Sequence, residues 1–393
     1  MLDGLFAWLL LPLGLVLGWA LRARNAGVAR PPAERGSVSA VQLGGLLHQL
    51  ESDDPDQAIV ALTQVGDLDP GAAELHLTLG KMFRKRGEVD RALRIHESLA
   101  SRDGIAPELQ AEARFELARD YHAAGVLDRA EELFQSLAEQ GRYVTAALDA
   151  IRTIHEQAHD WRPAIEAARR LEAALGESQR AAIAQYYCEL ADEAQAAKQP
   201  DEAVKFAKRA LDEEAGCVRA RLQLGGLEMA AGRHAVAAKH YLKAFEQDPR
   251  FLADVIEPLQ RCMAETKDRE GYLQFLHDAR EMSSSSLPFV AEARLLAEEG
   301  VDPLDRLAQG LEARPSRAVL AEFLEVLERQ PDVIASGLDK PAASLRQALV
   351  RLMESSPRYQ CSNCGFSPRQ MFWQCPACKH WGTTAPADDV MRV

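Results

Sequence analysis

Hydrophobic residues follow three different patterns along this chain. From Leu5 to Leu21, seventeen uncharged and mostly apolar residues stand in a row, near the lower length limit for crossing a hydrocarbon core of roughly 30 Å. From about Val41 onward, apolar residues recur at helical spacing in segments rich in Ala, Leu, Glu and Arg, without convincing alternating strand patterns. The last stretch, residues 357–393, instead holds paired cysteines and aromatic residues. The patterns predict a membrane helix, a long helical body and a small terminal module.

The N-terminal segment is predicted to be an uncleaved transmembrane anchor over residues 1–22. A cleaved signal peptide is the alternative, but the residues before the apolar run include Asp3 and no Lys or Arg, whereas secretory signals begin with positive charge. Four arginines follow the run within residues 22–35. Because positive charge is retained on the cytoplasmic side, we expect the N-terminus outside and the body in the cytoplasm. Residues 23–40, with Pro31 and Pro32, are expected to form a short juxtamembrane linker.

The body is predicted to be a tetratricopeptide-repeat array. The helical segments can be aligned on a small residue at the point where a second helix packs against the first. The aligned residues are Ala58, Ala92, Ala130, Ala164, Ala203 and Ala237, and the intervals between them are 34, 38, 34, 39 and 34 residues. A period of 34 is that of tetratricopeptide repeats. The segment 224–249 shows the full pattern at Gly225, Gly232, Ala237, Tyr241, Ala244 and Pro249. We therefore expect about six repeats within residues 41–250.

Beyond Phe251 the repeat pattern weakens. Residues 251–356 still read as divergent helical repeats: one pair before the serines at 283–286, a second pair ending near Leu311, and a final pair that leads into the terminal module. Eight or nine helix pairs are expected in all. The fold class predicted is all-α, a superhelical solenoid of tetratricopeptide repeats with one N-terminal transmembrane helix and a small C-terminal rubredoxin-like or zinc-ribbon module.

Composition and charge exclude some classes of function. The chain has 393 residues and a formal net charge of −13. Nucleic-acid binding needs clustered Lys and Arg to neutralise phosphates, so the charge argues against a nucleic-acid-binding body. No phosphate-binding Gly-rich loop or nucleophile elbow is visible in the sequence.

The terminal module carries the most specific motif. Cys361 and Cys364 form one Cys-x-x-Cys knuckle, and Cys375 and Cys378 form a second. Two such knuckles can place four thiolates tetrahedrally around one Zn or Fe ion; disulfides or a dithiol redox site are the alternatives. Five aromatic residues are expected to supply the apolar shell that so small a module needs, namely Tyr359, Phe366, Phe372, Trp373 and Trp381.

The remaining three cysteines, Cys188, Cys217 and Cys262, lie singly within helical patterns. We expect them to be small buried hydrophobic residues. An odd number of cysteines beside a thiolate metal site fits a reducing compartment.

One further motif suggests a different chemistry. His155, Glu156 and His159 match the His-Glu-x-x-His pattern in which two histidines bind zinc and the glutamate activates water. The motif falls in the first helix of a repeat, where His155 takes the position of Phe83 or Tyr121 in other repeats. His159 takes the turn position filled elsewhere by Gly, and no third ligand is evident. Ordinary repeat packing is therefore the prediction, with a membrane metalloprotease as the alternative.

An anchor, a repeat body and this terminal module together resemble the lipopolysaccharide assembly protein B family of Gram-negative bacteria. The most specific match is the pattern Tyr-x-Cys-x-x-Cys-Gly-Phe followed by Trp-x-Cys-Pro-x-Cys-x-x-Trp between Tyr359 and Trp381, similar to that family's rubredoxin-like tail. The second knuckle departs from the generic rubredoxin pattern, since Lys379 stands where Gly follows the first knuckle. That departure leaves open the hydrogen-bond pattern around the second knuckle.

The resemblance implies an inner-membrane adaptor without catalytic residues, its N-terminus periplasmic. Members of the family promote turnover of the deacetylase LpxC by the membrane protease FtsH and so limit lipopolysaccharide synthesis. The implied partners are the inner membrane, FtsH, LpxC and other lipopolysaccharide assembly or signalling membrane proteins, with a homodimer as a further option. A scaffold for another envelope-assembly complex, or a rubredoxin-like redox protein, is the alternative. We also expect the metal module to dock on the repeats and close the end of the array.

Overall fold

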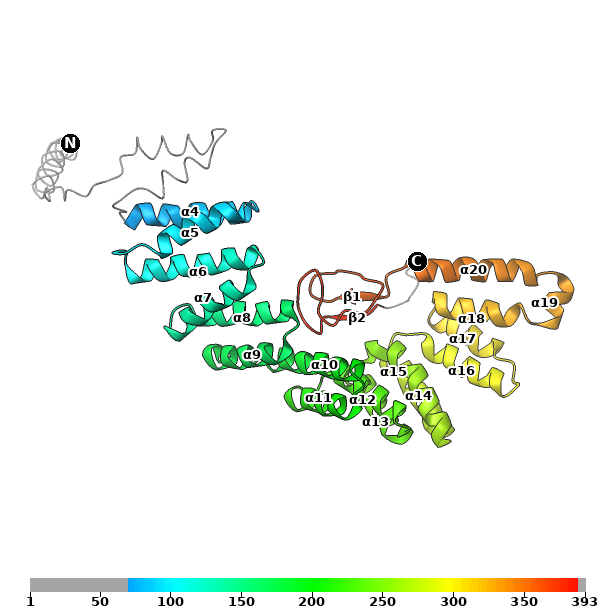
Figure 1. Ribbon diagram of the computed structural model, residues 1–393. Helices are drawn as coiled ribbons and strands as arrows, with labels where there is room; N and C mark the ends of the chain where they lie inside the picture. Colours follow the sequence, from blue (N-terminus) through cyan, green and yellow to red (C-terminus); the bar gives the residue numbers. More distant parts are fainter. Residues whose placement is uncertain (1–69, 388–393) are drawn as a thin grey trace, which may run out of the picture. The chain divides into compact units, whose positions relative to one another are not determined.

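The computed structural model describes residues 70–387 (Figure 1). The chain divides into two compact units between Arg142 and Tyr143. The predicted anchor at 1–22, the linker at 23–40 and the repeat containing Ala58 lie outside the described residues. Among the residues that are described, no helix is both long and apolar enough to cross a membrane.

The described part of the first unit, residues 70–142, contains two helix pairs. They are α4 (Pro70–Lys85) with α5 (Val89–Ala100), and α6 (Pro107–Ala123) with α7 (Leu127–Glu139). An ion-pair network joins α4 to α6, since the Arg84 guanidinium contacts the carboxylates of Glu116 and Asp120, both of which are buried. Asp120 also accepts from His96 on α5, with 2.5 Å between Nδ1 and Oδ2. Polar contacts therefore connect three consecutive helices of this unit.

The second unit continues the same architecture and ends in a small β module. Its helices are α8 (Val144–Ala158), α9 (Trp161–Leu175), α10 (Arg180–Ala196), α11 (Pro200–Glu213), α12 (Val218–Ala230), α13 (His234–Gln247), η1 (Pro249–Phe251), α14 (Leu252–Thr266), α15 (Arg269–Met282), α16 (Leu287–Glu298), α17 (Leu304–Ala313), α18 (Arg317–Leu327), α19 (Pro331–Ser336) and α20 (Asp339–Ser355). The three pairs expected after Phe251 are present as α14/α15, α16/α17 and α18/α20. The short α19 within the last pair was not predicted.

Small residues sit where paired helices meet, as the alignment predicted. Within the described chain, the aligned alanines all lie in second helices and are fully buried, namely Ala92, Ala130, Ala164, Ala203 and Ala237. Gly225 shows the same constraint on a first helix, because a Cβ there would lie 2.8 Å from the Tyr241 ring. Larger side chains at these positions would push the helices apart.

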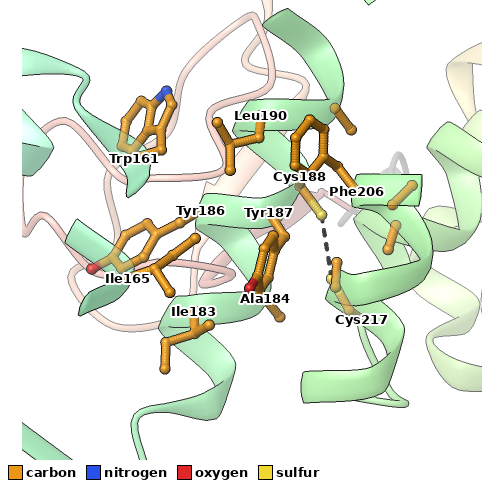
Figure 2. Close-up of a cluster of buried hydrophobic side chains, with 14 of the residues drawn as sticks. Trp161, Ile165, Ile183, Ala184, Tyr186, Tyr187, Cys188, Leu190, Phe206 and Cys217 are labelled. Carbon is orange, nitrogen blue, oxygen red and sulfur yellow. Dashed lines mark hydrogen bonds between the residues drawn. The ribbon is translucent and has the colours of Figure 1, made fainter. Parts of the chain in front are cut away.

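A continuous core runs through α9 to α12 (Figure 2). Trp161 and Ile165 from α9 pack against Ile183 and Tyr186 from α10. Cys188, Cys217 and Cys262 are 0%, 4% and 0% exposed, so the prediction that they are buried is confirmed. The Sγ atoms of Cys188 and Cys217 lie 3.8 Å apart, and burial raises the pKa of the Cys188 thiol.

The terminal module is a two-stranded antiparallel ribbon with two loops. Strands β1 (Tyr359–Cys361) and β2 (Thr384–Pro386) pair so that Tyr359 faces Pro386 and Cys361 faces Thr384. A further bridge between Gln374 and Trp381 closes the second loop. Each loop carries one Cys-x-x-Cys knuckle, so the ribbon brings the two knuckles together.

Candidate metal centre

The four cysteines of the module converge on one point. Their Sγ atoms all lie within 4.8 Å of one another, with 3.7 Å between Cys361 and Cys378 and 3.7 Å between Cys364 and Cys375. Thiolates at the usual zinc–sulfur distance of about 2.3 Å from a tetrahedral ion would be about 3.8 Å apart. The donor set therefore fits a single tetrahedral metal ion, and thiolates suit either Zn²⁺ or Fe.

Both knuckles make the same turn. The Gly365 N–H donates to the Cys361 carbonyl over 2.9 Å, and the Lys379 N–H donates to the Cys375 carbonyl over 2.8 Å. Lys379 adopts φ +60°, the left-handed conformation that Gly365 adopts at +76°. That conformation costs a side-chain-bearing residue about 1 kcal/mol. The sequence left open which hydrogen bonds the second knuckle makes, because Lys379 replaces the usual Gly. The structure shows that the second knuckle makes the same hydrogen bond as the first.

Hydrogen bonds around the sulfurs favour thiolates at some positions and not at others. The Asn363 side chain and the His380 N–H lower the pKa of Cys378 to about 5, and the Thr383 hydroxyl lowers the pKa of Cys361. The Phe366 N–H lowers the pKa of Cys364, but desolvation and the other three thiols outweigh it and raise this pKa to about 12. Four thiolates so close together repel one another, and a bound cation would relieve that repulsion.

Trp381 joins the module to the repeats at the buried carboxylate of Glu156 on α8. Its indole Nε1–H donates to Glu156 Oε1 over 3.1 Å, and Gln374 Nε2 donates to Oε2 over 3.3 Å. From the repeats, Arg152 Nη1 donates to Oε1 over 2.5 Å, and the Tyr186 hydroxyl on α10 also donates to Oε1. One carboxylate thus accepts from two groups of the module and two of the repeats.

Aromatic rings surround this carboxylate. The Trp381 ring lies edge-on to Tyr186, with 5.7 Å between centroids, and edge-on to Trp161 at 6.0 Å. The rings of Trp161 and Tyr186 are themselves stacked at 6.0 Å. Such pairs stabilise beyond the area they bury. The packing positions Trp381, three residues after Cys378, on α8, α9 and α10.

Trp373 makes a second contact on the other side of the same knuckle. Its ring stacks on Phe251 of η1 with 5.5 Å between centroids and 8° between planes. The guanidinium of Arg219 on α12 lies 5.6 Å from the Trp373 ring centre. Arg219 is buried and is held by Asp192 and Glu189 on α10. The two tryptophans that flank Cys375 and Cys378 thus bind different helices of the second unit.

The chain is similar to known proteins over nearly its whole length. The chain is 31% identical to lipopolysaccharide assembly protein B of Escherichia coli (strain K12), an alignment that covers 98% of each. It is 30% identical to the protein of the same name from Haemophilus influenzae, over 99% of each. The chain belongs to the lipopolysaccharide assembly protein B family. The resemblance stated from the sequence is thereby confirmed.

Family models match the terminal module and part of the repeat body. A rubredoxin metal-binding domain matches residues 359–386, and a tetratricopeptide repeat matches residues 49–111. Together with the four converging sulfurs, the first match supports a metal-binding site in this member of the family. A solved structure of MamA from Desulfovibrio magneticus, 18% identical, covers 45% of this chain and 95% of its own, with a TM-score of 0.30.

The His-Glu-x-x-His motif is part of the repeat packing. His159 ends α8 at φ +59°, in the turn position predicted for it, and its ring lies edge-on to Trp161. Glu156 binds Arg152, Tyr186 and Trp381, so its carboxylate is not placed to activate a water molecule. Among residues 70–387, the four cysteines are the one group of three or more His, Cys, Asp or Glu placed to hold an ion.

Two expectations about the module need correction. Its aromatic residues do not form a shell of their own, because Trp373 and Trp381 pack against the repeats and Phe366 is 38% exposed. The module does dock on the repeats, as expected, but its tryptophans contact α8, α9, α10, α12 and η1 in the middle of the array instead of closing its end. Glu156 and Arg219 were not predicted as docking residues. The motif that contains Glu156 was assigned only to packing within the repeat.

Proposed function

We propose that this protein is a non-catalytic inner-membrane adaptor that limits lipopolysaccharide synthesis by promoting degradation of the deacetylase LpxC by the membrane protease FtsH. The observation that carries the proposal is the match to lipopolysaccharide assembly protein B over 98% of the chain. A role in lipopolysaccharide assembly is what that name describes. The protease and the deacetylase are the partners that the family resemblance implies.

Each part of the chain has a role in this proposal. Residues 1–22 anchor the protein beside the protease, and residues 23–40 keep the body near the membrane. Confinement of this kind raises the effective concentration of a partner without new contacts. The helical repeats offer the extended surface with which repeat proteins bind other proteins.

The terminal module is assigned a structural role. Cys361, Cys364, Cys375 and Cys378 hold one Zn or Fe ion, and the ion keeps the two knuckles folded. The folded knuckles present Trp373 and Trp381 to Phe251 and Glu156. The ion thereby stabilises the repeat surface rather than supplying chemistry for a reaction.

The test is the half-life of the deacetylase in cells. Depleting this protein should lengthen that half-life severalfold, and re-expressing the full chain should restore it. A chain lacking residues 1–22 and a chain with serine at all four cysteines should both fail to restore it at matched expression. An unchanged deacetylase half-life on depletion would refute the proposal.

A further inference from the structure

The last helix of the array, α20, presents large apolar side chains to solvent (Figure 1). Within and just before it, Ile334, Leu338, Leu345 and Leu352 are 54%, 58%, 52% and 57% exposed. The other exposed large apolar residues of the described chain are scattered singly, which is ordinary for a protein surface. The end of a repeat array normally has a polar outer face. A cluster at this end therefore indicates a surface that another molecule covers.

Three of these residues form one row along α20. Leu338, Leu345 and Leu352 are spaced by seven residues, close to two helical turns, so their side chains leave the helix on the same side. Helix α18 packs on an adjacent side, where Arg346 of α20 pairs with Glu328 over 2.9 Å between Nη2 and Oε1. The packing against α18 thus leaves the leucine row exposed.

Two cations form a second row on the exposed face of α20. Lys340 and Arg351 are eleven residues apart, which is about three helical turns, and both are exposed. The small residues Ser344 and Ala348 are also exposed and lie between this row and the leucines. The exposed face therefore has an apolar edge and a cationic edge, on a chain whose net charge is −13.

This arrangement suits an anionic bilayer surface. Helices that lie in a membrane interface insert an apolar row beside the acyl chains, while Lys and Arg reach the lipid phosphates. The exposed carboxylate of Glu354 does not interfere, because it is nine residues, or two and a half turns, from Leu345 and so lies on the opposite side of α20.

A second copy of the chain suits the same face less well. An antiparallel two-fold pairing of α20 would bring the cationic edges of the two copies together, and like charges at an interface repel. A parallel pairing would place each cationic edge against leucines, without a carboxylate partner. The charge pattern therefore favours anionic lipid over self-association.

We propose that α20 docks on an anionic membrane surface, with the leucine row inserted and with Lys340 and Arg351 directed at lipid phosphates. The inference rests on the membrane anchoring in the proposed function. A tether raises the effective concentration of the bilayer near α20, so a contact of a few leucines is sufficient. Docking would give the body a membrane contact at the C-terminal end of the array, in addition to the anchor.

The experiment places a polarity-sensitive dye on this face in the full chain. Ser344→Cys is labelled with NBD, and the chain is reconstituted into lipid nanodiscs. In discs of equal parts phosphatidylglycerol and phosphatidylcholine, NBD emission should be about twofold brighter, and at shorter wavelength, than in discs of phosphatidylcholine alone. Salt at about 1 M, where the Debye length is about 3 Å, should reduce the difference. The chain without Ser344→Cys gives the background from native cysteines.

Substitutions at exposed positions separate the two edges. Leu345→Ser with Leu352→Ser should abolish the bright emission in both kinds of disc. Lys340→Gln with Arg351→Gln should abolish the preference for phosphatidylglycerol. The matched control is Leu175→Ser with Val236→Ser, two exposed apolar residues on other helices, and it should leave the emission unchanged.

Equal emission in the two kinds of disc would overturn the inference, as would a leucine variant that behaves like the parent chain. Emission that depends on the number of copies per disc, and not on lipid charge, would assign the face to a second copy instead. Co-purification with the discs reports the anchor separately. A chain that enters the discs without a dye response refutes the docking of α20 alone, whereas a chain that does not enter them contradicts the proposed anchoring and this inference with it.

Discussion

The role of Glu156 is determined by the fold and not by its local sequence motif. By sequence it is the middle of a zinc-protease motif, yet in the structure its buried carboxylate accepts from Arg152, Tyr186 and Trp381. A buried carboxylate is tolerated when it is paired and fully hydrogen-bonded. Here those donors come from two helices and from the terminal module, so Glu156 connects the three.

The bond between Glu156 and Trp381 can be measured with a double-mutant cycle. Trp381→Phe keeps a ring but removes the indole N–H, and Glu156→Gln keeps the shape but removes the charge. We expect a coupling free energy of about 1–2 kcal/mol, as for hydrogen bonds to charged groups. Urea unfolding followed by tryptophan fluorescence gives the four free energies, since Trp161, Trp373 and Trp381 all lie at the docking contacts.

Additivity of the two substitutions within about 0.5 kcal/mol would show that the two side chains do not interact. Replacing the exposed Phe366 by Leu serves as the control. It changes an aromatic residue of the same module that makes no contact with Glu156, so Phe366→Leu and Glu156→Gln should be additive.

Among single residues, the sequence predicted correctly those whose role depends on residues close to them in the sequence. The four cysteines were found because the spacing within each knuckle is itself the requirement for metal binding. The partners of Glu156 were not found, because Gln374 and Trp381 are 218 and 225 residues away along the chain. No periodicity or local motif records such a contact.

At the scale of elements, the helix pairs follow from small residues at fixed intervals and were predicted well. The alanines at positions 92, 130, 164, 203 and 237 are buried in successive second helices. Helix α19 was missed because it spans only six residues between Gln330 and Gly337, too few to show a helical period. The predicted anchor lies outside the described residues and stays a prediction.

Polar contacts between α4 and α6 make the first unit sensitive to acid. Burial raises the pKa of Glu116, but the hydrogen bond and charge of Arg84 outweigh it and hold this pKa below the ordinary value of 4.5. A carboxyl whose pKa is lower in the folded state stabilises that state above pH 4.5, and the stabilisation is lost as pH falls through the lowered pKa. We therefore expect α4 and α6 to lose protection against hydrogen exchange below about pH 4.

Glu116→Gln should remove part of this acid dependence and weaken α4 and α6 at pH 7 by about 2 kcal/mol, because Arg84 loses a buried partner. Exchange corrected for its intrinsic pH dependence measures both effects. Glu97→Gln, at an exposed position of α5, should leave the pH profile unchanged. An equal loss of protection in wild type and Glu116→Gln on acidification would contradict the assignment.

At the scale of the whole molecule, the metal module and the second unit's repeats depend on each other. A module this small cannot bury a core sufficient to fold alone. The metal ion and the docking of Trp373 and Trp381 supply what is missing. The seven cysteines can be used to follow this arrangement, because four belong to the module and the other three are buried among the repeats.

Removing the metal should therefore separate the cysteines into two classes. In the full chain under reducing conditions, all seven thiols should react slowly with iodoacetamide. After a strong chelator is added, the four module thiols should react at least tenfold faster, since bound thiolates are protected and free ones are not. Cys188, Cys217 and Cys262 should remain protected, as mass spectrometry of labelled peptides would show. Labelling of Cys188, Cys217 and Cys262 at the same rate as the module thiols would mean that the repeats unfold with the module.

The most direct test of the account is the half-life of LpxC in cells that express undocked protein. The variant is Trp373→Ala with Trp381→Ala, and the control is Phe366→Ala, an exposed aromatic of the same module. With equal amounts of each protein in the membrane, the account predicts that the control restores rapid turnover of LpxC. The undocked variant should leave LpxC as long-lived as depletion does. Full restoration of turnover by the undocked variant would contradict the claim that the docked module is needed for adaptor function.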